Sequence, residues 1–357
     1  MTTSIIGVDC HKTVHAAVAI DAQGHELGHW RGENTVTGWH ELQAWGAQYA
    51  PGACWGLEGS GQYGRGLAQV LVQEGATVFE VNPRLTATMR RGSRQRTKTD
   101  RTDALAVARV VAQDQATLPV VQVADASAAL AVLVAARDAV VADATRLRNR
   151  LHQHLAVLKP VCIGSWPSLT DMAAVAGLVR LELAVTQAVQ AAHLLLVRQV
   201  ATQLLAAMEQ AAHLKQEIEH QSQAWTAPLQ EIVGIGPLTA GMLAAHLGGR
   251  RFKDDAAVAM YAGVAPLEAS SGERIRHRLN RGGNRCLNAI LHRIVLTQRR
   301  CSVQGKAYLA RRQREGKTQA EAIRALKRLL IRIIFRAWKR CQVPLLQEVQ
   351  ISMTLHP

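Results

Sequence analysis

The stretch RQRTKTDRTDALA, residues 94–106, places two aspartates three residues apart at the start of a predicted helix. Residues three apart lie on the same face of a helix, so the side chains of Asp100 and Asp103 are expected to be neighbours. Two carboxylates at such close range repel each other unless a cation lies between them. The stretch therefore predicts a metal site on the first turn of this helix.

Basic residues surround this pair of acids. They are Arg90, Arg91, Arg94, Arg96, Lys98 and Arg101. The whole chain of 357 residues is also basic, with 42 Lys and Arg against 27 Asp and Glu and a formal charge of +15. Such an excess favours a nucleic acid partner over an anionic membrane surface, although a basic protein without such a partner is the alternative. Paired acids in a basic surround indicate a metal site that handles a polyanion.

The residues before this stretch predict an α/β layer. Strands are expected at residues 4–9, 14–20, about 25–30, 54–58 and 77–81, and helices at residues 37–49 and 61–74. The first three strands read as an antiparallel meander, and helices and strands alternate after it. This order is typical of a mixed sheet covered by helices.

Two further acids lie at the ends of predicted strands. Asp9 and Glu58 each follow a short apolar run, and the carboxyl ends of strands form the edge where α/β sheets bind ligands. If the helix with Asp100 and Asp103 packs across that edge, four carboxylates converge. Hard oxygen ligands suit Mg²⁺ or Mn²⁺, and two such ions can assist phosphoryl transfer. The alternative is that each acid is a helix cap or a solvated surface charge.

Two other patterns are interpreted as incidental to this site. Gly59–Gly64 matches the G-x-G-x-x-G spacing of dinucleotide-binding loops, but Glu58 just before it would repel a pyrophosphate, so a tight turn is favoured. His11 and His15 are four residues apart in a region where strands are expected. An extended chain would hold them about 13 Å apart, too far to share a metal.

The middle of the chain is predicted to be helical. An apolar seam with steps of three and four residues is formed by Val140, Ala144, Leu147, Leu151, Leu155 and Leu158. A second helical run covers about residues 171–223, and the link between the runs contains Pro160 and Pro167. This pattern predicts an antiparallel helical hairpin with coiled-coil character, either an arm for self-association or a simple spacer.

The last region begins near Ala227 and contains two features that favour phosphate contact. Residues 229–240 resemble a helix-hairpin-helix, in which the backbone amides after Gly234 and Gly236 could hold a phosphate, although an ordinary glycine turn is the alternative. Residues 318–340 form a basic amphipathic helix. Thr318 and Glu321 are expected to make its capping box, and the buried stripe is expected to be Ile323, Leu326, Leu330, Ile333 and Ala337.

A loop between these features carries two serines, Ser270 and Ser271. The basic residues that follow it are Arg274, Arg276, Arg278, Arg281 and Arg285. A serine hydroxyl is a poor nucleophile alone, but guanidinium groups beside it could stabilise the charge that develops on an attacked phosphodiester. A serine in such a loop is more often a turn former, so spacing alone leaves both roles open.

Taken in order, these motifs resemble the DEDD-type insertion-sequence transposases of the IS110 family, the bridge recombinases. The resemblance rests on motifs spread over nearly the whole chain. They are residues 6–9, 57–63, 81–83, 98–104, 262–266, 271–272 and 281–284. The helical middle carries the least specific part.

The resemblance implies a RuvC-like, RNase H-type first domain whose metal-binding acids are Asp9, Glu58, Asp100 and Asp103. It also implies that a serine before glycine is the DNA nucleophile, the place that Ser271 holds here. Because this chain reads Ser-Ser-Gly, Ser270 is the alternative. Family resemblance further implies a covalent phosphoserine intermediate, active sites shared between subunits of a homo-oligomer, and a structured noncoding guide RNA.

The sequence thus predicts an α/β plus all-α chain of three regions. Residues 1–118 are the predicted catalytic domain, residues 119–225 a helical oligomerisation region, and residues 226–357 a mainly helical transposase domain. The predicted activity is Mg²⁺- or Mn²⁺-dependent cleavage and exchange of DNA strands, in a cytoplasmic, nucleoid-associated protein of a bacterium or archaeon without a membrane segment. One alternative is a junction-resolving nuclease that uses metal-activated water, and another is a non-catalytic nucleic-acid-binding protein.

Overall fold

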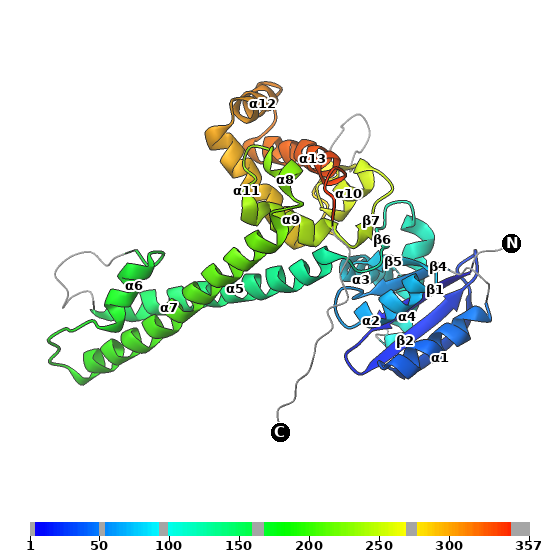
Figure 1. The fold of residues 1–357 in the computed structure, drawn as a ribbon, viewed down its shortest axis with the longest axis horizontal. Helices are drawn as coiled ribbons and strands as arrows, with labels where there is room; N and C mark the ends of the chain where they lie inside the picture. Colours follow the sequence, from blue (N-terminus) through cyan, green and yellow to red (C-terminus); the bar gives the residue numbers. More distant parts are fainter. Residues whose placement is uncertain (1–3, 50–53, 93–98, 159–167, 269–276, 344–357) are drawn as a thin grey trace. The chain divides into compact units, whose positions relative to one another are not determined.

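The computed structural model describes residues 4–49, 54–92, 99–158, 168–268 and 277–343, and it divides the chain into two compact units (Figure 1). One unit combines residues 1–128 with residues 225–357, and the other consists of residues 129–224. We call these the sheet unit and the helical unit. The three predicted domain boundaries stay predictions.

A mixed seven-stranded sheet forms the centre of the sheet unit. Its strands are β1 (Ile5–Cys10), β2 (Val14–Ile20), β3 (Glu26–Glu33), β4 (Cys54–Glu58), β5 (Thr77–Val81), β6 (Val120–Val121) and β7 (Arg250–Arg251), in the spatial order β3-β2-β1-β4-β5-β6-β7. The β1, β2 and β3 strands form an antiparallel meander, and β4 and β5 run parallel to β1. The prediction of a mixed sheet covered by helices is confirmed.

Alternation along β1 sends its side chains to two different cores. Ile6 and Val8 pack in a cluster with residues of α1 (Val36–Ala47) and α2 (Arg65–Gln73). Ile5 belongs to the cluster on the other face, which includes Ala104 and Val107 of α4 (Asp100–Asp114). Because successive residues of a strand point to opposite faces, Gly7 and Asp9 share the α4 face with Ile5.

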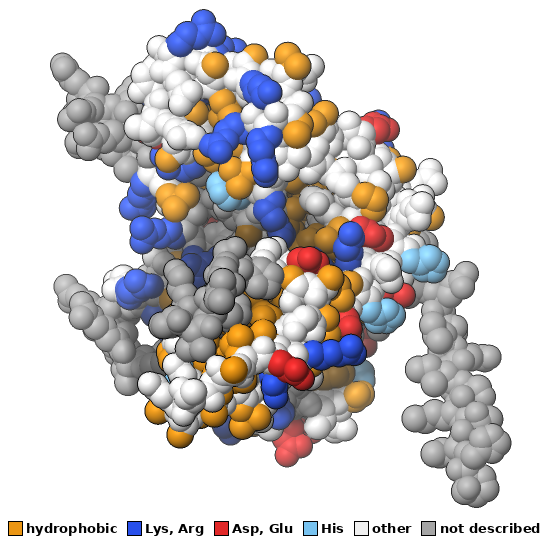
Figure 2. All heavy atoms as spheres, turned by 90° about the vertical axis from the view of Figure 1, so that its left-hand side faces the viewer, with side chains coloured by type: hydrophobic (Ala, Val, Ile, Leu, Met, Phe, Trp, Pro, Cys, Tyr) orange, Lys and Arg blue, Asp and Glu red, His pale blue; other side chains and the backbone are white. Residues whose placement is uncertain are grey.

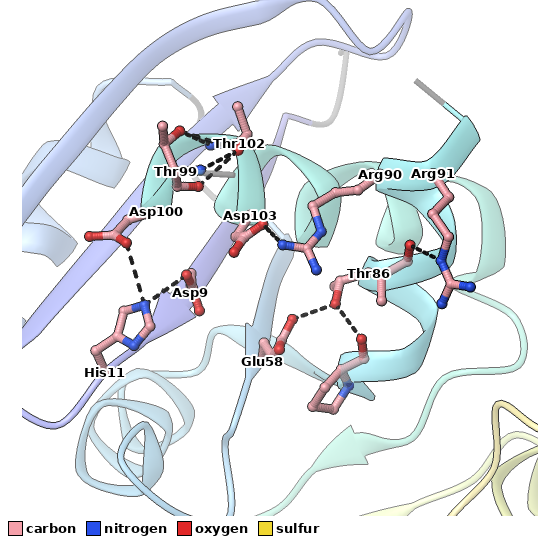
Figure 3. Close-up of polar contacts among 12 residues, drawn as sticks. Asp9, His11, Glu58, Thr86, Arg90, Arg91, Thr99, Asp100, Thr102 and Asp103 are labelled. Atoms are coloured by element: carbon pink, nitrogen blue, oxygen red, sulfur yellow. Dashed lines mark hydrogen bonds and ion pairs between the residues drawn. The ribbon is translucent and has the colours of Figure 1, made fainter. Parts of the chain in front are cut away.

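Two glycines let α4 approach the sheet closely. A methyl group on Gly7 of β1 would come within 2.3 Å of the carbonyl oxygen of Ala104, and one on Gly56 of β4 within 2.4 Å of Cγ2 of Val111. Side chains at these positions would push the helix outward. The glycines therefore hold α4 against the sheet, beside α3 (Pro83–Gly92), with its N-terminus toward the acid-bearing edge (Figure 3).

The helical unit consists mainly of two long helices and a short one. They are α5 (Ala126–Leu158), α6 (Met172–Val179) and α7 (Ala188–Ser222). In the predicted seam of α5, Leu151, Leu155 and Leu158 are buried in one cluster with Leu194 and Leu204 of α7. Much of the apolar seam is therefore covered by α7 within the chain, and self-association stays a prediction.

The α7 helix is the one described helix that is long and apolar enough to cross a membrane by length and composition. A core helix of a soluble protein passes the same test, and Leu194, Val197 and Leu204 of α7 are buried in the shared cluster. The finding is therefore weak support for a membrane segment.

The C-terminal part of the sheet unit is mostly helical, as predicted. Its elements are α8 (Ala227–Gln230), α9 (Pro237–Leu247), α10 (Asp255–Tyr261), the hairpin of β8 (Leu267–Glu268) and β9 (His277–Arg278), α11 (Arg285–Cys301), α12 (Val303–Arg314) and α13 (Gln319–Trp338). The capping box of Thr318 and Glu321 begins α13. The predicted stripe was wrong at Ile333, which is 40% exposed, because Ile334 takes the buried position one residue later.

Candidate active site

Two of the predicted acids lie side by side on the sheet. Asp9 of β1 and Glu58 of β4 are in-register partners on neighbouring parallel strands, so their side chains leave the same face. Asp9 is buried and Glu58 is half-buried. The strand positions predicted from the sequence therefore bring two carboxylates together at the carboxyl edge of the sheet.

The other two acids lie on the first turn of α4. Thr99 caps this helix, and its side chain and that of Thr102 make reciprocal hydrogen bonds in a capping box. Negative charge is favourable at a helix N-terminus, because the backbone dipoles point their positive ends there. Asp100 and Asp103 are thus fixed where the helix begins, and Figure 3 shows both beside Asp9 and Glu58.

Burial and neighbouring charges shift the pKa values of two of these acids, Asp9 and Glu58. Burial raises the pKa of Asp9 most, the interaction with His11 opposes this, and the negative charges of Asp103 and Asp100 raise it further. Burial also raises the pKa of Glu58, and Asp9 and Asp103 add to the effect. The neighbouring carboxylates therefore make Asp9 and Glu58 harder to ionise. A divalent cation among the four acids would offset that repulsion, so this donor set fits a divalent metal ion.

His11 belongs to this cluster, and its interpretation as incidental was wrong. Its Nε2 lies 3.0 Å from Oδ2 of Asp9 and 3.7 Å from Oδ1 of Asp100. The three residues each offer a ligand atom, and these atoms lie within 4.8 Å of one another. The spacing argument considered only whether His11 could share a metal with His15. The missed signal was its position just after β1, at the same edge as Asp9.

The α3 helix holds two of the acids in place. The hydroxyl of the buried Thr86 lies 2.6 Å from Oε2 of Glu58, where it donates a hydrogen bond, and four residues later Arg90 forms an ion pair with Asp103. Sequence reasoning treated Arg90 only as part of the basic surround and missed Thr86. No local pattern marks Thr86, because its role depends on how α3 packs against β4 and α4.

Several predicted site residues lie outside the described residues. They are Arg94, Arg96, Lys98, Ser270, Ser271, Arg274 and Arg276. Among the described ones, Arg101 forms an ion pair with Glu26 at 2.8 Å. Arg278, Arg281 and Arg285 are exposed.

The motif that contains Arg281 contacts the α3 helix. Nη1 of Arg84, near the start of α3, donates a 2.6 Å hydrogen bond to the carbonyl oxygen of Arg281. Thr86 and Arg90 of the same helix contact two of the acids. One helix therefore touches both the acid cluster and a motif from the C-terminal part of the chain.

The predicted glycine turn before α9 is present. Gly234 has a φ of +94°, a conformation that favours glycine. Gly236 is the N-cap of α9, and a methyl group placed on it would meet nothing within 4 Å. The first turn of α9 is therefore open to a ligand, and phosphate binding there stays a prediction.

Comparisons with known proteins agree with this geometry. A family model for DEDD transposases of the IS110 type matches residues 6–160, which include all four acids. A second model, for transposases of the IS116/IS110/IS902 family, matches residues 226–310. The insertion element IS110 uncharacterized 43.6 kDa protein of Streptomyces coelicolor is 31% identical over 145 residues, 40% of this chain and 36% of that protein. The match thus spans about a third of the relative's length. With two models in chain order, the chain belongs to the IS110 family of transposases.

Proposed function

We propose that this chain is the transposase of an insertion sequence, a site-specific recombinase that cuts and rejoins DNA strands. The observation that carries the proposal is the convergence of Asp9, Glu58, Asp100 and Asp103 at one edge of the sheet, inside a region that matches a transposase family model. The strand order β3-β2-β1-β4-β5, with α4 on one face, supports assignment of this part to the RuvC-like, RNase H-type folds.

The four acids would hold the metal, with His11 as an additional ligand from the loop after β1. A divalent ion bound there supplies positive charge for the phosphate of a DNA strand. Thr86 and Arg90 hold Glu58 and Asp103 in fixed positions, which limits the rearrangement needed when a ligand binds. Burial and the neighbouring carboxylates raise the pKa values of Asp9 and Glu58, and a cation bound beside them would favour their charged form.

Ser271 is the proposed nucleophile, with Ser270 as the alternative, and this assignment rests on the family resemblance. A guide RNA and a homo-oligomer are proposed on the same basis. The exposed Arg278, Arg281 and Arg285, which follow the two serines in the sequence, support contact with nucleic acid backbone. The open glycine turn before α9 supports a helix-hairpin-helix-like phosphate contact.

Strand cleavage of the DNA at the element's ends tests the metal site. In the presence of Mg²⁺ and the RNA encoded beside the gene, the wild-type chain should cut, and Asp103→Asn should lower the rate by at least about 100-fold. Asp143→Asn is the matched control, because Asp143 is an exposed helical acid whose ion pair within the described part of the chain is with the nearby Arg146. Equal activity of both variants would disprove the metal assignment.

A covalent-adduct experiment tests the nucleophile. If Ser271 attacks the phosphodiester, denaturing gels of wild-type reactions should contain DNA linked to the protein, and peptide mapping should locate the link. Ser271→Ala should lose the adduct, and Ser270→Ala should keep it. Cleavage by Ser271→Ala without any adduct in the wild type would instead indicate a nuclease that uses water.

A further inference from the structure

A basic cavity lies in the C-terminal part of the sheet unit, apart from the four acids. It has a volume of about 760 Å³ and is bounded by α11, α12, α13 and the turn at residues 263–266. Its described walls carry seven cationic side chains and one acid. The cations are Arg278, Arg312, Lys317, Arg324, Lys327, Arg328 and Arg332, and the acid is Glu321.

Nearby acids neutralise only part of this charge. Asp255 forms an ion pair with Arg332, and Glu315 pairs with Arg312 at 2.7 Å. With Glu321 counted as well, three acids face seven cations, so four positive charges remain in excess. Figure 2 shows the same bias at the surface: Lys and Arg side chains gather on the upper left of the view, at the height of α11–α13 in Figure 1, where acidic side chains are sparse. Such an excess around a concave site favours a polyanionic ligand.

Lys327 lies within the cavity wall and is half-buried. Its Nζ lies 2.8 Å from Oδ1 and 3.4 Å from the backbone oxygen of Asn288. Among the described residues no carboxylate lies within 4.0 Å of this ammonium group. Burial lowers the pKa of Lys327, and the positive charge of Arg324 lowers it further. A partly buried cation without an acidic partner is stabilised when an anion binds beside it.

Asn288 connects this cation to the family motif at residues 262–266. Its Nδ2 donates hydrogen bonds to the backbone oxygens of Ala262 at 2.9 Å and Gly263 at 3.2 Å. The motif then leads into the β8 strand of the hairpin. Asn288 therefore connects a ligand bound at Lys327 to the turn at residues 262–266, which leads in the sequence to the two serines.

The residues that line the cavity fit the backbone of a single strand. Cations lie on several walls and can surround one chain of phosphates, whereas a duplex presents its phosphates on a broad convex surface. Tyr308 is the aromatic residue among the described lining residues, and the Arg312 guanidinium covers its ring at 5.6 Å. Base stacking is therefore limited, and contact with phosphates dominates.

We propose that this cavity binds the phosphodiester backbone of a single nucleic acid strand, with Arg324 and Lys327 contacting the phosphates. The proposal deepens the proposed function and rests on it, because the cavity is lined by Arg278 and by the turn at residues 263–266, which leads into β8. Single-stranded DNA and single-stranded RNA share this chemistry. The experiment below distinguishes them.

Equilibrium binding of labelled oligonucleotides to the full chain tests the proposal. Arg324→Gln should weaken binding of a single strand about tenfold and reduce the slope of log K against log salt by about 0.7, the value for one phosphate contact. Lys306→Gln is the matched control, because Lys306 is exposed on α12, carries the same charge and does not line the cavity. Lys327→Gln should act like Arg324→Gln if its melting temperature shows that it folds.

The comparison of strands assigns the source of the ligand. If Arg324→Gln loses affinity for single-stranded RNA alone, the ligand is a strand of the guide. If it loses affinity for single-stranded DNA alone, the ligand is a strand of the element or target. An equal loss of affinity for both would identify a site that accepts either backbone. All three support the cavity as a single-strand site. Equal losses for Arg324→Gln and Lys306→Gln, or a larger loss for duplex DNA than for single strands, would overturn it.

The outcome can be separated from that of the proposed function. Metal-dependent cleavage by the wild-type chain, without a specific effect of Arg324→Gln on binding, would overturn the cavity and leave the transposase assignment intact. If Arg324→Gln weakens single-strand binding but DNA cleavage does not depend on Asp103, the cavity stands as a binding site and the metal-dependent function is overturned.

Discussion

Gly7 of β1 lies directly beneath Ala104 of α4, so closely that a methyl group on Gly7 would come within 2.3 Å of the Ala104 carbonyl oxygen. The backbone nitrogen of Ala108 would be equally close. These are backbone atoms, which cannot move aside as the end of a flexible side chain can. The absence of a side chain at Gly7 therefore sets the distance between Asp9 on the strand and the two aspartates on the helix.

Gly7→Ala should destabilise the fold and impair the metal site together. Overpacking of this kind typically costs about 1–3 kcal/mol of unfolding free energy. Because α4 must shift outward, Asp100 and Asp103 move away from Asp9, and the gain in melting temperature on adding Mg²⁺ should shrink. Urea denaturation measures the first effect, and thermal melts with and without Mg²⁺ measure the second.

Gly177→Ala is the control for this substitution. Gly177 is exposed in α6, and a methyl group there would meet nothing within 4 Å. Alanine is favoured over glycine inside a helix by about 0.5–1 kcal/mol, so this variant should be slightly more stable and respond to Mg²⁺ normally. A Gly7→Ala chain that is as stable as the wild type and responds equally to Mg²⁺ would contradict the close packing.

Thr86→Val should weaken metal binding without unfolding the chain. Valine has nearly the shape of threonine, so the buried site keeps its packing, but Glu58 loses the 2.6 Å hydrogen bond that orients it. Loss of such a supporting partner typically lowers metal affinity or activity about 10–100-fold. Titration with Mn²⁺, followed calorimetrically, gives the affinity.

Thr88→Val separates this effect from a general loss of polarity on α3. The Thr88 hydroxyl is exposed and donates to the Arg84 carbonyl oxygen at 2.8 Å, so it supports no acid of the site. The Thr88→Val affinity should match that of the wild type. If both variants bind Mn²⁺ equally well, Thr86 does not position Glu58.

The sequence predicted the sheet and its acids because their signals are local. Asp9 and Glu58 each follow a short apolar run, and alternation decides the face to which each points. Asp100 and Asp103 are three residues apart at the start of a predicted helix, so their place on one face of its first turn could be inferred from spacing. The resemblance to transposases could be recognised only from the order of several motifs along the chain, because each motif alone is short.

The missed residues depend on contacts between distant segments. His11 reaches Asp100 across 89 residues of chain, and Thr86 reaches Glu58 only because α3 packs beside β4. The same limit applies to β7, whose two arginines extend a sheet that begins more than 200 residues earlier. Ile333 and Ile334 show a smaller error, because adjacent apolar residues leave the helical phase ambiguous by one position.

Glu80 and Arg250 form a largely buried ion pair that joins β5 to β7. The Arg250 Nε lies 2.5 Å from Oε2 of Glu80, the side chains are 18% and 20% exposed, and the guanidinium also lies over the ring of Tyr261 at 5.7 Å. Glu80→Gln should cost about 3 kcal/mol of unfolding free energy, because it leaves the arginine without its countercharge. Urea denaturation at neutral pH provides the measurement.

The double variant Glu80→Gln, Arg250→Gln tests the cause. If the uncompensated charge is responsible, the double variant should lose less unfolding free energy than the sum of the losses of the two single variants. The difference should be about 1 kcal/mol or more. Strictly additive losses would show that the two side chains act through packing instead of through their charges.

His246 should make the stability of the sheet unit depend on pH. Burial and the nearby Arg250 lower its pKa to about 4, from an ordinary value of 6.5. Between pH 6.5 and pH 4, His246 binds a proton in the unfolded chain but stays neutral in the folded chain. The free energy of unfolding that this histidine contributes above pH 6.5 is therefore lost as the pH falls toward 4. The free energy of unfolding then falls with a slope that approaches about 1.4 kcal/mol per pH unit. The total loss between pH 6.5 and pH 5 is about 2 kcal/mol.

His246→Gln should remove this part of the pH dependence in urea denaturation. His40→Gln, which changes an exposed residue of α1, should leave it in place. The same slope in the wild type and in His246→Gln would show that the pKa of His246 is the same in the folded and the unfolded chain.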